Sequence, residues 1–108
     1  MDFQNLKSML RFSDEKYQKV NLFETPQTAM DVYCLQPGQS QKLHSHANTD
    51  KYYVVWEGRA VVQIGTEVRE LGPGEAALAR PGVDHSISNH SGAPLIALVF
   101  QAPKSFGH

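Results

Sequence analysis

The sequence has few of the features that mark several large protein classes. It contains a single cysteine, Cys34, so no disulfide can form within the chain. Ten Lys and Arg nearly balance eleven Asp and Glu, and there is no long basic run, so the charge pattern argues against a nucleic-acid partner. No apolar stretch approaches the length of a membrane span. The first residues include an early acid and too few consecutive apolar residues for a signal peptide, so we expect a cytoplasmic protein.

What remains is the composition of an ordinary globular chain. Its 108 residues, 41% of them hydrophobic and 19% charged, suffice for one buried core but not for two. Apolar residues recur at helical spacing in residues 3–10, which predicts a short amphipathic helix there. We expect an N-terminal extension at residues 1–19, a β-barrel at residues 20–101 and a C-terminal tail at residues 102–108.

Beyond the N-terminal segment, the sequence predicts a succession of short strands. The stretch KYYVVWE at residues 51–57 is rich in aromatic and β-branched residues, and AVVQI at residues 60–64 follows it like the second arm of a hairpin. Pro37-Gly38 and Gly72-Pro73-Gly74 are typical turn sequences. The other expected strands are 20–24, 28–36, 42–46, 75–79, 84–89 and 95–101. Such closely spaced strands indicate an all-β sandwich or barrel.

Three histidines are the residues best suited to carry chemistry. His44 and His46 are separated by one residue, so on a strand their side chains leave the same face, about 6–7 Å apart at the backbone. His85 begins another extended segment after the turn Pro81-Gly82. It can reach the same point only if the sheet curls to face itself, as in a barrel. The spacing therefore suggests a mononuclear metal site, whereas the alternative is an ordinary polar loop.

These stretches resemble the two sequence motifs of the cupin superfamily. The first motif is a glycine, five residues, HxH, three or four residues, a glutamate, six residues and a glycine. The chain has Gly38, His44, His46, Lys51 at the position of the glutamate, and Gly58. In the second motif Gly74, Gly82, His85 and Asn89 stand at the expected spacing, with Arg80 where a proline is usual and Pro81 one place later.

The resemblance implies a jelly-roll barrel, also called a double-stranded β-helix. It also implies a divalent transition metal, namely iron, manganese, zinc, nickel or copper, between His44, His46 and His85. Some cupins have three histidines and no acidic ligand, and several of these are similar to iron-dependent dioxygenases. Other small cupins are isomerases, epimerases, or binding and sensing modules.

Lys51 departs from the family pattern, because an ammonium replaces a carboxylate ligand. Its side chain can point away from the site, be neutral, or pair with an anion such as Asp50, Glu57 or a ligand carboxylate. Asp50 can supply a fourth metal ligand only if a bulge changes the face on which it lies. Tyr53 shares the face of Lys51, so both are candidate catalytic residues, while Tyr52 and Trp56 are expected to face outward.

The sequence thus predicts a metal-binding barrel with dioxygenase-like chemistry on a small anionic molecule. The alternatives are a non-catalytic binding or sensor protein and a sugar isomerase or epimerase, for which Lys51 or Tyr53 would act as acid or base. Small barrels often pair through their sheets, so we expect a homodimer with the N-terminal segment or Trp56 at the contact. We expect a small-molecule ligand and neither a nucleic acid nor a membrane as partner.

Overall fold

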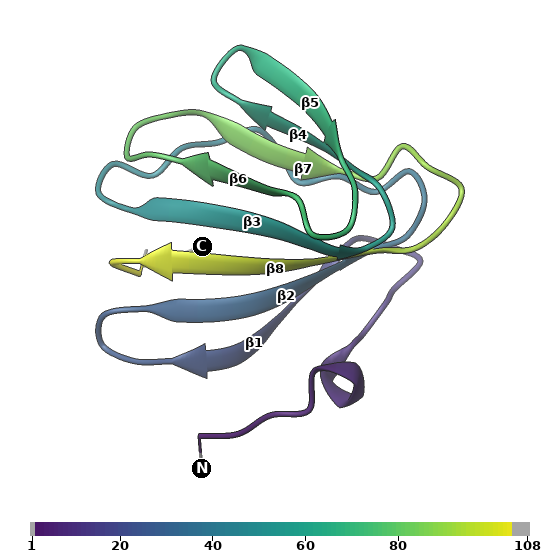
Figure 1. Cartoon of the computed structure of the whole chain (residues 1–108), viewed down its shortest axis with the longest axis horizontal. Coiled ribbons are helices and arrows are strands. Elements are labelled where there is room, and N and C mark those ends of the chain that lie inside the picture. Colours follow the sequence, from purple (N-terminus) through teal and green to yellow (C-terminus); the bar gives the residue numbers. More distant parts are fainter. Residues whose placement is uncertain (1, 105–108) are drawn as a thin grey trace.

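The chain folds into two antiparallel sheets that face each other, as Figure 1 shows for the computed structural model, which describes residues 2–104. The strands are β1 (Gln18–Glu24), β2 (Ala29–Leu35), β3 (Asp50–Glu57), β4 (Ala60–Ile64), β5 (Glu67–Leu71), β6 (Ala76–Ala79), β7 (His85–Ser88) and β8 (Leu95–Ala102). One sheet has the order β1-β2-β8-β3-β6 and the other β5-β4-β7. The predicted all-β jelly-roll is confirmed.

The core lies between the two sheets and follows from alternation along each strand. In β3, Lys51, Tyr53 and Val55 are buried and face the interior, while Tyr52 is 39% exposed on the opposite face. Inward-facing residues of both sheets form one apolar cluster, made of Tyr33, Leu35, Tyr53, Val55, Ala60, Val62, Leu71, Ile87, Leu95, Ala97 and Val99. This core holds the sheets together but stops short of the histidines, so polar groups line the barrel beyond it.

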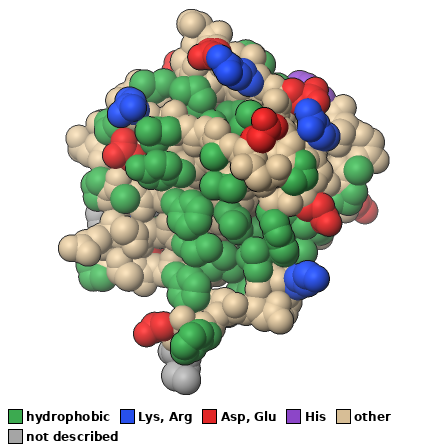
Figure 2. All heavy atoms as spheres, in the orientation of Figure 1, with side chains coloured by type: hydrophobic (Ala, Val, Ile, Leu, Met, Phe, Trp, Pro, Cys, Tyr) green, Lys and Arg blue, Asp and Glu red, His purple; other side chains and the backbone are tan. Residues whose placement is uncertain are grey.

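The outer face of the five-stranded sheet is also apolar, and part of it is covered by the chain itself. The N-terminal segment contains η1 (Leu6–Met9), a single 3-10 turn within residues 3–10, where a short amphipathic helix was predicted. It packs with Trp56 on an outer cluster around Leu22 and Ile96. Trp56 thus faces outward, as predicted. Figure 2 shows hydrophobic side chains gathered over this face. They border a groove of about 630 Å³ beside Tyr52. The predicted homodimer stays a prediction.

Two motif residues have structural explanations. Gly58, in the turn between β3 and β4, has φ +89°, and a Cβ atom there would clash with the Pro94 carbonyl oxygen. Asn89 is buried, and its amide nitrogen donates to the carbonyl oxygens of Leu35 and Ala93. These two positions therefore serve the fold rather than the chemistry.

One expected strand is absent from the described part of the chain. Residues 42–46 were predicted as a strand, yet within them only His44 forms a bridge, an isolated one with His85; another isolated bridge, Ser40 with Ser88, lies just before the segment. The segment crosses from β2 to β3 along the edge of β7, where its backbone pairs only at single residues and forms no continuous ladder.

The remaining boundaries are described only in part. Strand β1 begins at Gln18, and β8 ends at Ala102. The predicted tail, residues 102–108, runs past the described residues, and the division into extension, barrel and tail stays a prediction. None of the helices in residues 2–104 has the length and hydrophobicity needed to cross a membrane. The cytoplasmic location also stays a prediction.

Candidate metal centre

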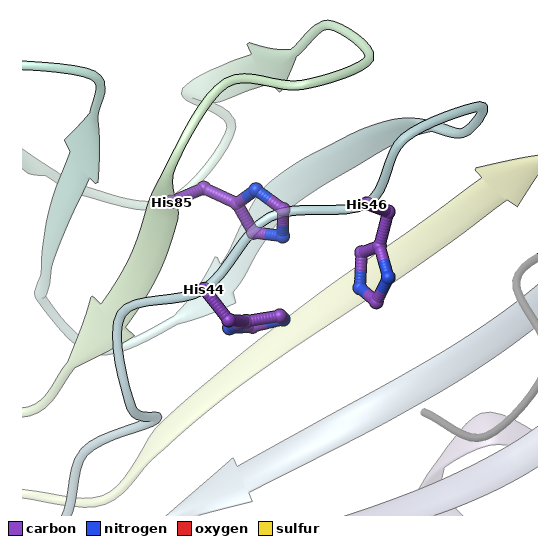
Figure 3. A group of neighbouring side chains, drawn as sticks. All are labelled: His44, His46 and His85. Carbon is purple, nitrogen blue, oxygen red and sulfur yellow. The ribbon is translucent and has the colours of Figure 1, made fainter.

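The three histidines predicted as metal ligands meet at one point inside the barrel. Figure 3 shows His44 and His46 reaching from the β2–β3 connection toward His85 at the start of β7. Their ring centroids are 4.4 Å apart for His44 and His85, 5.0 Å for His44 and His46, and 5.5 Å for His46 and His85. One ring nitrogen from each lies within 4.8 Å of the others. Two ligands of one ion stand about 3–4 Å apart when each bond is about 2.1 Å, so these rings are close to a binding geometry.

Backbone hydrogen bonds set this arrangement. The amide of His44 donates to the His85 carbonyl at 3.1 Å, and the amide of His85 donates back to His44 at 2.8 Å. His44 and His85 are therefore directly opposite each other, with their side chains on the same face. The amide of Gly82 donates to the His46 carbonyl at 2.8 Å, which ties the loop before β7 to the third histidine.

The hydrogen bonds of the rings leave the metal-binding nitrogen available. Nδ1 of His44 lies 2.6 Å from the Lys42 carbonyl oxygen, and Nδ1 of His85 lies 2.9 Å from that of Val83. A carbonyl only accepts, so Nδ1 carries the proton in both rings and Nε2 has the free electron pair. Nε2 of His85 is buried and has no hydrogen-bond partner among the described residues. Such backbone-oriented imidazoles are typical of metal ligands.

Burial also favours the neutral rings that a metal requires. It lowers the pKa of His44 and that of His85 below the ordinary value of 6.5, and the positive charge of Lys51 lowers both further. Both rings are therefore neutral at pH 7. Metal binding at this pH then needs no proton release from either ring.

Lys51 points into the barrel and not away from it. Its side chain is fully buried, with Nζ 5.4 Å from the ring centroid of Tyr33 and 5.8 Å from that of Tyr53. No hydrogen-bond partner of Nζ is found within residues 2–104. Burial first, and then the charge of Lys19, lowers the pKa of Lys51 to about 8. The ammonium is therefore mostly protonated at pH 7.

Neither of the two carboxylates predicted as partners, Asp50 and Glu57, is buried with this ammonium: Glu57 is exposed at the far end of β3. Asp50 stands on the opposite face of β3, and the register irregularity of that strand falls between Val55 and Glu57, so no bulge turns Asp50 inward. Asp50 is not part of the histidine cluster in the described chain. Within residues 2–104 no carboxylate forms an ion pair with Lys51, although the charge of the buried Asp31 acts on it.

A buried polar network that sequence reasoning missed adjoins the site. The Tyr53 hydroxyl donates to Oε1 of Gln41 at 2.6 Å, and Nε2 of Gln41 donates to the Tyr33 hydroxyl at 3.4 Å. Burial raises the pKa of Tyr53 and of Tyr33, so both phenols stay protonated near neutral pH. Tyr53 is therefore a hydrogen-bond donor there and not a base. A single buried glutamine in a loop has no periodic signal that would reveal it.

We expect Tyr53→Phe to lower the free energy of unfolding by about 1–3 kcal/mol, because it leaves a buried Gln41 oxygen without its donor. The matched control is Tyr52→Phe on the exposed face of the same strand, where a change within about 0.5 kcal/mol is expected. Urea unfolding followed by fluorescence measures both. Equal stabilities of the two variants would contradict the role of this network.

Comparison with known proteins agrees with this architecture. Residues 31–100 match the family described as cupin domain. The structure of TT1209 from Thermus thermophilus is 40% identical, covers 97% of this chain and 100% of its own, and superposes with a TM-score of 0.94. A Klebsiella pneumoniae protein with a double-stranded β-helix domain is 26% identical over 99% of this chain and 94% of its own, with a TM-score of 0.90.

A more distant structure supports the fold alone. KdgF from Halomonas sp. is 20% identical over 89% of this chain and 86% of its own, with a TM-score of 0.80. No curated protein matches the chain.

Proposed function

This chain belongs to the cupin family, and on that premise we propose that it is a mononuclear metalloprotein with dioxygenase-like chemistry on a small anionic molecule. The observation that carries the proposal is the convergence of three imidazoles beside a buried ammonium. His44, His46 and His85 would hold a divalent transition metal. Three protein ligands leave coordination positions open for other molecules.

The residues present fit such an ion. The donor set is entirely imidazole nitrogen, which suits zinc, copper, iron and nickel. The buried Nε2 of His85 lacks a hydrogen-bond partner in the described structure, as expected of an atom whose partner is a metal. When bound, a divalent ion supplies Lewis-acid chemistry and, if it is iron, redox chemistry.

The side chains around the histidines have separate roles in this proposal. Lys51 stabilises negative charge on the bound molecule, whether a carboxylate or an enolate, because its ammonium is buried and close to the rings. Tyr53, whose ring lies 6.1 Å from that of His85, positions Gln41 and closes the inner end of the site. The buried surroundings exclude water and strengthen the interaction of Lys51 with an anion.

The test begins with elemental analysis of untagged protein purified without chelators. One divalent ion per chain is expected. Iron(II)-loaded protein is then mixed with acetylacetone, a small chelating enolate, and with short carboxylates while oxygen uptake is recorded. Oxygen uptake equal to the amount of acetylacetone or carboxylate consumed supports the proposal of an enzyme. Anion binding without uptake favours the binding or sensor protein, and a chain that retains no metal overturns the proposal.

A further inference from the structure

A second lysine lies at the solvent-exposed edge of the site, which we call its entrance, because the charge of Lys19 acts on both His44 and Lys51. Lys19, on β1, is exposed, and its Nζ atom is 5.7 Å from the ring centroid of Tyr33 and 5.9 Å from that of Tyr17. Tyr33 is the ring that also contacts the buried ammonium of Lys51. One aromatic ring therefore separates an ammonium at the entrance from an ammonium at the histidines.

Aromatic rings connect these two positions. Tyr17 and Tyr33 have centroids 5.7 Å apart, Tyr33 and Tyr53 are 6.4 Å apart, and Tyr53 is 6.1 Å from His85. The three tyrosines thus form a wall that runs from Lys19 to the candidate metal centre. Tyr33 and Tyr53 are fully buried, so a short carbon chain would meet this wall only after the groups that cover the rings move aside. It would then have flat apolar contact and a positive charge at each end.

The charges along this wall are poorly balanced by the chain itself. Asp31 is the carboxylate whose charge acts on Lys51, and one of its oxygens already accepts from the Asn21 amide at 2.9 Å. The two ammonium groups repel each other, since the charge of Lys19 is among the causes that lower the pKa of Lys51. A buried, unpaired ammonium with a like charge nearby is costly, and an anion between them would relieve both costs.

We infer that the ligand of this site carries two anionic groups, one held by Lys51 beside the histidines and the other by Lys19 at the entrance. The inference rests on the proposed function and narrows its ligand to a small dianion with a short carbon spacer, such as a dicarboxylate. Lys19 is then a residue that determines specificity rather than one that reacts.

The experiment compares dicarboxylates with monocarboxylates of the same carbon number on zinc-loaded protein. Succinate, glutarate and adipate are titrated against butyrate, valerate and hexanoate by calorimetry at low ionic strength. At least one dicarboxylate should bind roughly fivefold or more tightly than its monocarboxylate, the ratio expected for one additional ion pair near the surface. Lys19→Gln should remove this preference, whereas the control Lys7→Gln, an exposed lysine on η1, should retain it.

The outcomes separate this inference from the proposed function. A preference for dicarboxylates that survives in Lys19→Gln, or no preference in the wild type, overturns the role of Lys19 even if metal and monocarboxylates still bind. Loss of the preference at high salt is expected, because screening weakens an exposed charge. By contrast, a chain without metal, or anion binding that Lys51→Gln leaves unchanged, contradicts the proposed function itself.

Discussion

His85→Ala is expected to weaken metal binding by roughly 100-fold or more, since loss of a residue that only orients a ligand already costs about 10–100-fold. The variant removes one of three nitrogen donors and leaves a cavity that only water can fill. His85 is also the most buried of the three, and no fourth His, Cys, Asp or Glu of the described chain joins the cluster to replace it. Competition with a chromophoric chelator measures the affinity, and elemental analysis gives the stoichiometry.

The matched control for this variant is His90→Ala. His90 lies five residues further on, is exposed, and is not part of the histidine cluster. The affinity of this control should equal that of the wild type. Wild-type affinity in His85→Ala would show that the rings meet for structural reasons and hold no ion.

A second variant protects this test against misfolding. His85 pairs with His44 through its backbone and is almost fully buried, so His85→Ala risks a loss of stability unrelated to metal. His46 is partly exposed in the β2–β3 connection, where truncation leaves the core intact. His46→Ala should therefore lose metal affinity while it keeps the circular dichroism spectrum of the folded chain.

Most of the fold could be predicted because its signals are local. The alternation in residues 51–57 predicted β3 and the inward direction of Lys51 and Tyr53, and both are buried. Turn residues such as Gly58 marked where strands end. Residues 42–46 were predicted wrongly as a strand, because an extended segment with suitable spacing looks the same in the sequence whether or not its backbone forms a continuous ladder.

The histidine cluster could be predicted, but its surroundings could not. His44, His46 and His85 stand at motif spacing, whereas Lys19 belongs to a strand with no motif. The apolar residues of β1, Val20 and Leu22, pack on the outer face beneath the N-terminal segment. The polar residues of β1 therefore face the site. In a strand that lines a core, the apolar residues usually face inward and the polar residues outward. Only the packing of the N-terminal segment reveals this.

Lys51→Met is expected to stabilise the metal-free protein by about 2 kcal/mol at pH 7, which corresponds to roughly 8–16 °C in melting temperature for a chain of this size. The wild-type ammonium is fully buried, has no hydrogen-bond partner in residues 2–104, and has its pKa lowered from 10.5 to about 8. Each pKa unit corresponds to about 1.4 kcal/mol, and the lost contact of the cation with aromatic rings offsets about 1–2 kcal/mol of the gain.

The pH dependence gives this prediction a second readout. Below pH 8 Lys51 is protonated in both the folded and the unfolded chain, so its burial cost is fully present. Between pH 8 and 10.5 the unfolded chain binds more protons, so the wild-type stability rises with pH through this window. Lys51→Met lacks this titration. The stability difference between variant and wild type should therefore shrink above pH 8.

Measurement of the unfolding free energy from pH 7 to 9.5 in the presence of EDTA isolates the effect of Lys51. Above this range the buried tyrosines, whose pKa values burial raises, would lower the stability of both proteins as the unfolded phenols ionise. Lys7→Met is the control for loss of an exposed charge. A Lys51→Met protein that is less stable than the wild type at pH 7, or a difference that does not change with pH, would mean that the chain itself neutralises this ammonium. An anionic ligand would then gain little from Lys51. A bound anion is stabilised by Lys51 only if the folded chain leaves the free-energy cost of this buried ammonium uncompensated.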